Sequence, residues 1–143
     1  MVYHMKTEHP FSADNLALIT QKAYFFRDSN STYTAIGTES VRGCYAITLF
    51  HQTKQGIIHW DDNTKHSQLP IVIDTFLKDI DAKECVVNLA GGWHDNAESA
   101  RTGEFLKSFF KEKQFQLTLN GYQQKSQNGS NRDVQGFFYI ILD

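Results

Sequence analysis

A cysteine and a histidine lie on neighbouring apolar segments in a pattern that could support nucleophilic chemistry. Cys44 begins the run Cys-Tyr-Ala-Ile-Thr-Leu-Phe-His, and His59 lies within the next apolar segment, Ile-Ile-His-Trp. A thiolate is a strong nucleophile, and an adjacent imidazole is a common base for activating it. Buried cysteines also serve as small hydrophobic core residues, so core packing is the alternative interpretation of Cys44.

Two predicted strands position this pair. Residues 44–51 alternate between two faces as a strand does, residues 52–56 are rich in turn formers, and residues 57–60 return as the second strand of a hairpin. The sequence therefore predicts that Cys44 and His59 lie on adjacent antiparallel strands.

The length of the hairpin turn decides whether the two side chains share a face. A turn centred on Gln52-Thr53 would pair Cys44 with Asp61 and leave His59 diagonal to Cys44 on the same face. Diagonal neighbours lie ~7 Å apart, within reach of each other's side chains. A three-residue loop would put the two side chains on opposite faces and exclude joint chemistry.

The remaining patterns predict an α+β fold, with a β-sheet sandwich core flanked by helices, in one domain over residues 1–143. Apolar residues recur at helical spacing over 69–80 and from about 96 to 113, whereas 85–90 is a short continuous apolar run typical of a buried strand. Ser67 is a candidate N-cap for the first helix, and 122–133 is a predicted polar loop. Further predicted strand segments are 32–36, 115–119 and 136–142.

The remaining cysteine, histidine and glycine residues give weaker evidence for a functional site. Cys85 sits in the apolar run and is expected to be core, while His51, His66 and His94 show no metal-binding spacing, so no metal site is predicted. The pair Gly91-Gly92 follows a predicted strand but lacks the spacing of a phosphate-binding loop, which favours a tight turn.

Composition limits the partners. The formal net charge is −2 with no basic stripe, which argues against a general nucleic-acid binder, and no apolar run is long enough to span a bilayer. Two cysteines make no disulfide framework. We therefore expect reduced thiols and a cytoplasmic protein, with signal-less export as an alternative.

A longer series of motifs resembles one enzyme family. Ile36-Gly-Thr, Cys44, Ile57-Ile-His-Trp-Asp61, Leu69-Pro-Ile-Val-Ile and Val87-Asn-Leu-Ala-Gly-Gly-Trp-His-Asp95 occur in this order. The series resembles the N-terminal half of the protein N-terminal asparagine amidohydrolases, over roughly residues 33 to 120. More distantly, the Gly-Thr, Cys and His pattern is similar to the CheD chemotaxis receptor deamidases and the cytotoxic necrotizing toxins.

The resemblance implies an enzyme that hydrolyses a side-chain carboxamide of a peptide or protein without a metal or cofactor. It implies Cys44 as the nucleophile, His59 as its acid and base partner, and Thr38 as a hydroxyl beside the pair. A nearby imidazolium would favour the thiolate by charge pairing. The chain departs from the amidohydrolases at Arg42-Gly43, where they have two threonines, and it matches only their N-terminal half.

We expect Asp61, Arg42, Trp60 and Gly92 to contribute to substrate binding. A substrate with a free α-amino group needs a carboxylate, and Asp61, Asp62 and Asp95 are the nearest in the motifs, although solvated turn residues are the simpler interpretation. Arg42 would instead suit an acidic partner surface.

Three alternatives remain to deamidation of an N-terminal Asn. One is deamidation of a glutamine in a specific partner protein, and another is a non-catalytic protein-binding module that keeps the scaffold. The third is acyl transfer to an amine through the same thioester. The sequence defines neither the oxyanion donors nor the oligomeric state.

Overall fold

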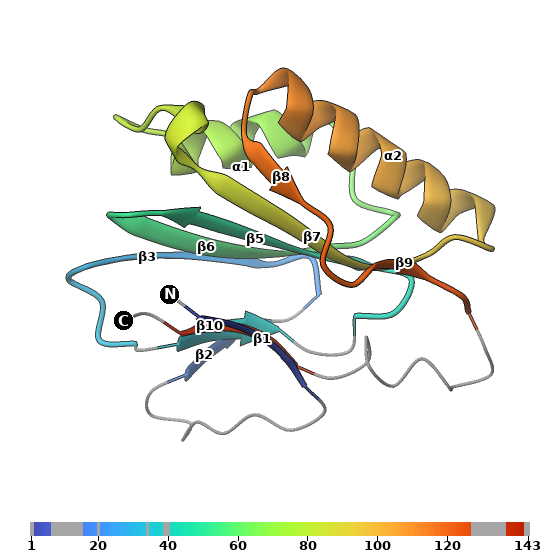
Figure 1. Ribbon diagram of the computed structural model, residues 1–143, viewed down its shortest axis with the longest axis horizontal. Coiled ribbons are helices and arrows are strands. Elements are labelled where there is room, and N and C mark those ends of the chain that lie inside the picture. The colour runs from blue at the N-terminus through green and yellow to red at the C-terminus, as the bar shows by residue number, and fades with distance from the viewer. Residues whose placement is uncertain are drawn as a thin grey trace.

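The computed structural model describes residues 2–6, 16–19, 21–33, 35–38, 41–126 and 137–141. Two β-sheets and a pair of helices stack in three layers, with the helices on one outer side and the smaller sheet on the other (Figure 1). The elements are β1 (Val2–Lys6), β2 (Leu16–Ile19), β3 (Tyr24–Asp28), β4 (Ala35–Thr38), β5 (Tyr45–His51), β6 (Lys54–Trp60), α1 (Gln68–Phe76), a 3-10 turn (Ala82–Glu84), β7 (Val86–Trp93), α2 (Ala97–Glu112), β8 (Gln116–Thr118), β9 (Tyr122–Gln124) and β10 (Phe137–Ile141). The fold is α+β, as the sequence predicts.

The larger sheet is built around the predicted hairpin. Its strand order is β3-β6-β5-β7-β8, and β9 pairs with the far end of β7. His51 pairs with Lys54, so the loop is the two residues Gln52-Thr53, and Ala46 pairs with His59. Of the two turn lengths considered from the sequence, the structure has the even-numbered one, and β6 begins at Lys54, three residues earlier than predicted.

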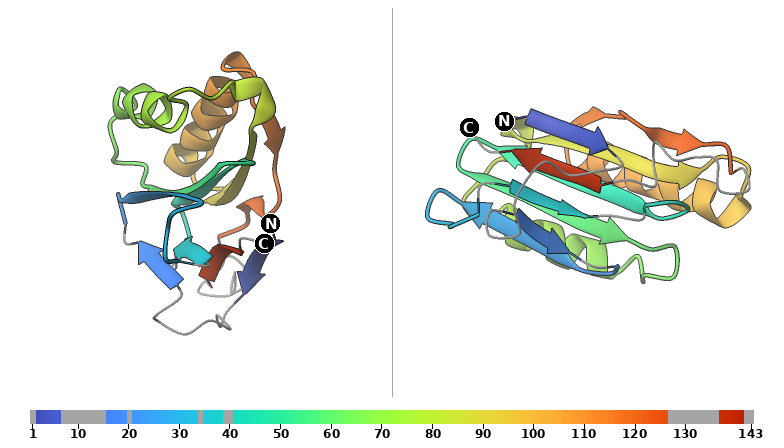
Figure 2. Two further views of the ribbon diagram at one scale, coloured as in Figure 1. Left: turned by 90° about the vertical axis from the view of Figure 1, so that its left-hand side faces the viewer. Right: turned by 90° about the horizontal axis from the view of Figure 1, so that it is seen from below.

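The smaller sheet covers one face of the larger one. Its order is β1-β10-β4-β2, with β2 parallel to β4 and the other pairs antiparallel. Figure 2 shows it lying across the larger sheet on the side away from the helices. Ile36 of β4 and Ile57 of β6 are fully buried where the sheets meet, and Ala17, Ile19 and Phe25 pack around them.

Both helices cover the opposite face. Asn96 caps α2, because its side chain accepts a hydrogen bond from the Ser99 N–H at 3.0 Å. Ser67 occupies the N-cap position of α1, as predicted, but its side chain makes no capping hydrogen bond. The largest core cluster lies between helices and sheet, and each fully buried large side chain there contributes about 1.5–3 kcal/mol. Its fully buried large members include Tyr45, Ile47, Leu49, Leu69, Ile73, Phe76, Leu89, Leu106 and Phe110.

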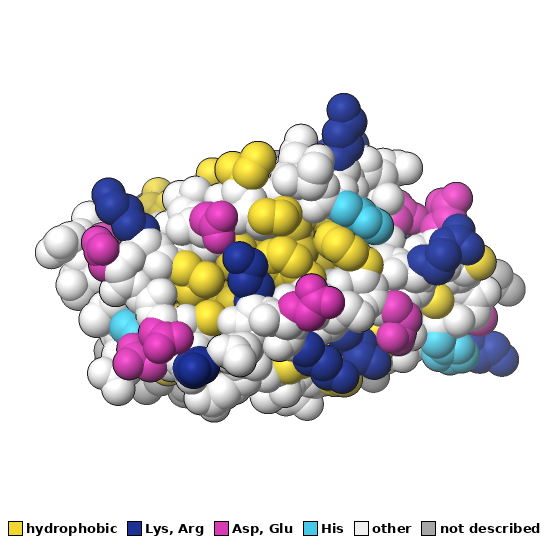
Figure 3. Space-filling model, turned by 90° about the horizontal axis from the view of Figure 1, so that it is seen from above, with side chains coloured by type: hydrophobic (Ala, Val, Ile, Leu, Met, Phe, Trp, Pro, Cys, Tyr) yellow, Lys and Arg dark blue, Asp and Glu magenta, His cyan; other side chains and the backbone are white. Residues whose placement is uncertain are grey.

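The outer surface of the helix layer carries exposed apolar side chains. Figure 3 views this side of the molecule and shows hydrophobic atoms gathered between charged side chains. Ile71 is 67% exposed, and Phe105 and Phe109 are partly buried. Neither helix is long and apolar enough to cross a membrane, as far as the described residues extend.

Two predicted boundaries are wrong for a common reason. β7 does not end at Ala90 but continues through Gly91 and Gly92 to Trp93, because glycine permits their φ angles of 88° and 81° within the strand. Residues 122–124, predicted as loop, pair with this extension as β9. The rest of that predicted loop, beyond residue 126, lies outside the described residues.

Candidate active site

A short polar chain joins the two sheets at the site. The Oγ1 atom of Thr38 lies 2.8 Å from Nδ1 of His59 and donates to the carbonyl oxygen of Ile19 at 3.0 Å. Because the single hydroxyl proton is committed to Ile19, the hydroxyl can only accept from His59. The neutral imidazole therefore carries its proton on Nδ1 and leaves a lone pair on Nε2.

The Nε2 atom of His59 is buried and has no hydrogen-bond partner among the described residues. His59 itself is only 4% exposed, and its backbone is fixed by β6 and by bonds with Lys22 and Ala23. An unpartnered buried nitrogen costs free energy in a purely structural role. Its lone pair is, in contrast, what a general base requires.

Cys44 lies on the same face of the sheet as His59. It directly precedes β5, and extending the register by one pair places it opposite Asp61 and diagonal to His59. Its side chain is partly exposed, whereas Thr38 and His59 are buried. Cys44 is therefore the most accessible residue of the three, as a nucleophile needs to be.

The backbone around Cys44 is held from the helix side. The N–H of Gly92 donates to the carbonyl oxygens of Cys44 and Arg42, both at 2.8 Å. Ser99, in the first turn of α2, donates its hydroxyl proton to the Gly43 carbonyl and accepts from the Trp93 N–H, each at 2.8 Å. These bonds fix the position of the cysteine relative to the sheet.

Gly91 and Gly92 are required by this arrangement. A Cβ added to Gly91 would lie 2.4 Å from the Cys44 carbonyl oxygen, and one added to Gly92 would lie 2.2 Å from the Tyr45 ring. The strand can pass beneath Cys44 only without side chains here. Gly92 thus supports the cysteine from below, and its N–H is already used in doing so.

The electrostatics favour a neutral thiol and a neutral imidazole. Burial, with the charges of Asp61 and Asp62, raises the pKa of Cys44 from 9.0 to about 11. Burial lowers the pKa of His59 from 6.5, and Asp61 only partly opposes that shift. A preformed thiolate–imidazolium pair, as expected from sequence, is therefore disfavoured, and His59 must take the thiol proton during attack.

Two aspartates lie beside the cysteine. Burial would raise the pKa of Asp61, but the Asn63 N–H at 2.6 Å and the amide of Gln21 lower it, so Asp61 is ionised at neutral pH. Burial and the adjacent Asp61 charge raise the pKa of Asp62. The pair makes this side of the site negative.

The other predicted substrate-binding residues are differently placed. Trp60 is 3% exposed and packs in the core beneath the helices, on the opposite face of the sheet from His59. The structure therefore does not bring Trp60 to the site, since adjacent strand residues point to opposite faces.

Arg42 is exposed two residues before Cys44. The carboxylate of Asp95 instead accepts the N–H and hydroxyl of Ser126.

Gln21 is a site residue that the sequence analysis missed. Its Nε2 atom donates to Oδ2 of Asp61 and lies 3.9 Å from the Cys44 sulfur. No sequence pattern marks it, because it occurs in a turn 23 positions before the cysteine. Only the pairing of β3 with β6 brings that turn to the site.

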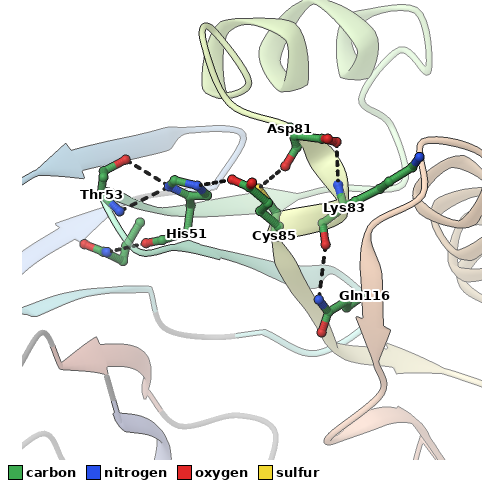
Figure 4. A network of polar contacts seen from close by, with 8 residues as sticks. His51, Thr53, Asp81, Lys83, Cys85 and Gln116 are labelled. Carbon is green, nitrogen blue, oxygen red and sulfur yellow. Dashed lines mark hydrogen bonds and ion pairs between the residues drawn. The ribbon is translucent and has the colours of Figure 1, made fainter.

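Cys85 and His51 lie away from the candidate site and make structural contacts. Figure 4 shows His51 beside Thr53, whose Oγ1 atom lies 2.9 Å from the Nδ1 atom of His51. The Nε2 atom of His51 lies 3.1 Å from Oε2 of Glu84. Cys85 is fully buried, as predicted, and donates to the Asp81 carbonyl at 3.5 Å. No cluster of three potential metal ligands occurs in the part of the chain that the structure describes.

Comparison with known proteins adds no assignment. No protein-family model matches the chain, and no curated protein matches its sequence. The geometry of Thr38, Cys44 and His59, together with the motif resemblance, is therefore what indicates a function.

Proposed function

We propose that this protein is a cysteine-dependent amidohydrolase that deamidates a side-chain carboxamide, that of an N-terminal Asn, in a peptide or protein. The observation that carries the proposal is the Thr38–His59 contact of 2.8 Å, which leaves the imidazole Nε2 free on the face shared with Cys44. The motif resemblance to the asparagine amidohydrolases supports the same chemistry. Two packed sheets with flanking helices are compatible with the scaffold of the related chemotaxis receptor deamidases.

The proposed reaction begins with transfer of the Cys44 thiol proton to Nε2 of His59 as sulfur attacks the amide carbon. A carbon–sulfur bond forms, and the carbonyl electrons move onto oxygen. The oxyanion then collapses, the carbon–nitrogen bond breaks, and His59 returns the proton to the leaving nitrogen, which departs as ammonia. This leaves a thioester on Cys44.

Water completes the cycle. Neutral His59 removes a proton from water as the hydroxyl attacks the thioester carbon, and the carbon–sulfur bond breaks. The thiolate regains its proton from His59, and the product carboxylic acid loses its own proton to solvent, which leaves a carboxylate in place of the amide. Thr38 keeps the imidazole in the tautomer that both half-reactions use.

The charges around the cysteine support a substrate with a cationic group near its carboxamide. Asp61 and Asp62 lie close enough to raise the pKa of Cys44. An α-ammonium group is the cation nearest to the side chain of an N-terminal Asn, and binding it would offset that negative potential. Internal glutamines offer no such charge.

Deamidation of a glutamine on a partner protein is the second candidate. The exposed side chain of Arg42 beside the nucleophile favours it, because a cation there could meet an acidic partner surface. Both candidates share the thioester chemistry and differ in the substrate. The two free cysteines suit the reducing cytoplasm, where we expect the enzyme to act.

Ammonia release tests the proposal. Wild-type protein and Cys44→Ala are incubated with one peptide that begins with Asn and one that carries an internal Gln. Release from the first peptide alone, lost in Cys44→Ala, is the expected result, and release from the second alone would favour the glutamine deamidase. Ammonia release that survives Cys44→Ala would exclude the thiol mechanism. If neither peptide releases ammonia, the remaining explanations are a folded-protein substrate and the non-catalytic binding module.

A further inference from the structure

The turn that precedes β3 is fixed to the strand that carries His59. The Lys22 N–H donates to the His59 carbonyl at 3.1 Å, and the His59 N–H donates to the Ala23 carbonyl at 3.0 Å. Lys22 adopts a positive φ of 64°, which completes the turn. The backbone of Gln21 therefore has a defined position relative to the proposed base.

The side chain of Gln21 extends from this turn between Asp61 and the nucleophile. Its Nε2 atom contacts Oδ2 of Asp61 and lies 3.9 Å from the sulfur of Cys44. A carboxylate only accepts hydrogen bonds, so the amide must present its nitrogen rather than its oxygen to Asp61. Asp61 thereby fixes which end of the amide faces the thiol.

An amide nitrogen carries two protons, and Asp61 uses one of them. The second donates to the Cys44 sulfur at 3.9 Å, on the side where a tetrahedral adduct would place its oxyanion two bonds from the sulfur. Gln21 is also exposed, so its amide lies at the entrance to the site rather than behind the buried pair. A preorganised side-chain amide at this point is the kind of donor that stabilises such oxyanions.

We propose that Gln21 donates a hydrogen bond to the oxyanion of the deamidation reaction and that Asp61 is the positioning residue that orients it. This inference rests on the proposed amidohydrolase activity. It also changes the expected role of Asp61, because Asn63 occupies Oδ1 and Gln21 occupies Oδ2. Asp62 is a second carboxylate near Cys44, and it stands beside Asp61 as a candidate to meet a substrate ammonium.

The test is a double-mutant cycle measured as ammonia release from the peptide that begins with Asn. Gln21→Met keeps the side-chain length without a donor, and removal of one oxyanion donor lowers kcat on the order of 10²–10³-fold. Gln52→Met is the matched control, because Gln52 is exposed in the remote β5–β6 turn. Alkylation of Cys44 by iodoacetamide forms no oxyanion, so its rate should stay within about twofold in Gln21→Met.

Asp61→Ala should lower kcat in the same way, and combining it with Gln21→Met should cause no further loss. Additive losses would overturn the positioning role of Asp61. Gln21→Met with the kcat of wild type, or with alkylation slowed as much as turnover, would overturn the oxyanion role. Wild-type protein that releases no ammonia from this peptide would refute deamidation of an N-terminal Asn and this inference with it, an outcome distinguishable from an active Gln21→Met.

Discussion

Thr38 and His59 lie on strands of different sheets, yet their side chains meet at 2.8 Å between Oγ1 and Nδ1. The contact joins the two sheets at His59. In the register of β5 and β6, this is the position diagonal to Cys44. Because the Thr38 proton goes to Ile19, the contact also defines the imidazole tautomer. One hydroxyl therefore connects the fold to the proposed chemistry.

Replacing Thr38 tests this connection. Thr38→Val keeps the shape but removes the acceptor for Nδ1–H. Losing a hydrogen bond to the imidazolium that forms in the transition state costs about 1.5–3 kcal/mol, which corresponds to roughly a 10- to 150-fold loss of kcat. Thr38→Ser should restore most of the activity because it keeps the hydroxyl. Equal losses in both variants would show that packing, rather than the hydrogen bond, matters at this position.

The pH dependence follows from two shifted groups. Burial lowers the pKa of His59 below 6.5, so the base is neutral above that pH and kcat/KM should rise with pH through an acid limb centred below 6.5. The thiolate of Cys44, followed by ultraviolet absorbance against Cys44→Ala, should appear only near its raised pKa of about 11. A thiolate already present below neutral pH would instead indicate a stable ion pair.

Ser99 offers a test of how the nucleophile is held. Ser99→Ala removes the hydroxyl that joins Gly43 to Trp93, and the unpaired backbone groups should lower the free energy of unfolding by about 1–3 kcal/mol. Activity should fall as well, because Cys44 is the next residue. Ser108→Ala, an exposed position on the same helix, is the control for urea unfolding and turnover. Indistinguishable behaviour of the two variants would argue against this support.

Gly92 should tolerate no side chain. Gly92→Ala combines a positive φ with a Cβ 2.2 Å from the Tyr45 ring, so we expect a loss of about 2–5 kcal/mol in the free energy of unfolding. Thermal unfolding compared with Ala97→Gly, an exposed change at the start of α2, measures the effect. A melting temperature for Gly92→Ala no lower than that of the control would contradict the close approach seen in the structure.

Sequence periodicity was informative where a local pattern determines the geometry. The two-residue turn at Gln52-Thr53 sets the parity of the hairpin, and parity alone puts Cys44 and His59 on one face. The same rule puts Trp60 on the other face, so its expected role is incompatible with any register that places Cys44 and His59 on one face. Parity could have excluded it without a structure.

Features that depend on distant segments were not predictable. Gly91-Gly92 has the composition of a turn, and only the packing of Cys44 and Tyr45 against the glycines keeps them in the strand. Gln21 reaches the site through pairing between β3 and β6, which no periodicity in its own turn indicates. The raised pKa of Cys44 depends on burial and on two aspartates, which the spacing of Cys44 and His59 does not reveal.

The central claim is that Cys44 carries the acyl group during turnover. The most direct measurement is mass spectrometry of the acid-quenched enzyme during reaction with the peptide that begins with Asn, in wild type and Cys85→Ala. We predict an adduct of the peptide minus ammonia on Cys44 in both proteins, and neither adduct nor ammonia in Cys44→Ala. An adduct on Cys85, or ammonia released at the wild-type rate by Cys44→Ala, would contradict the mechanism.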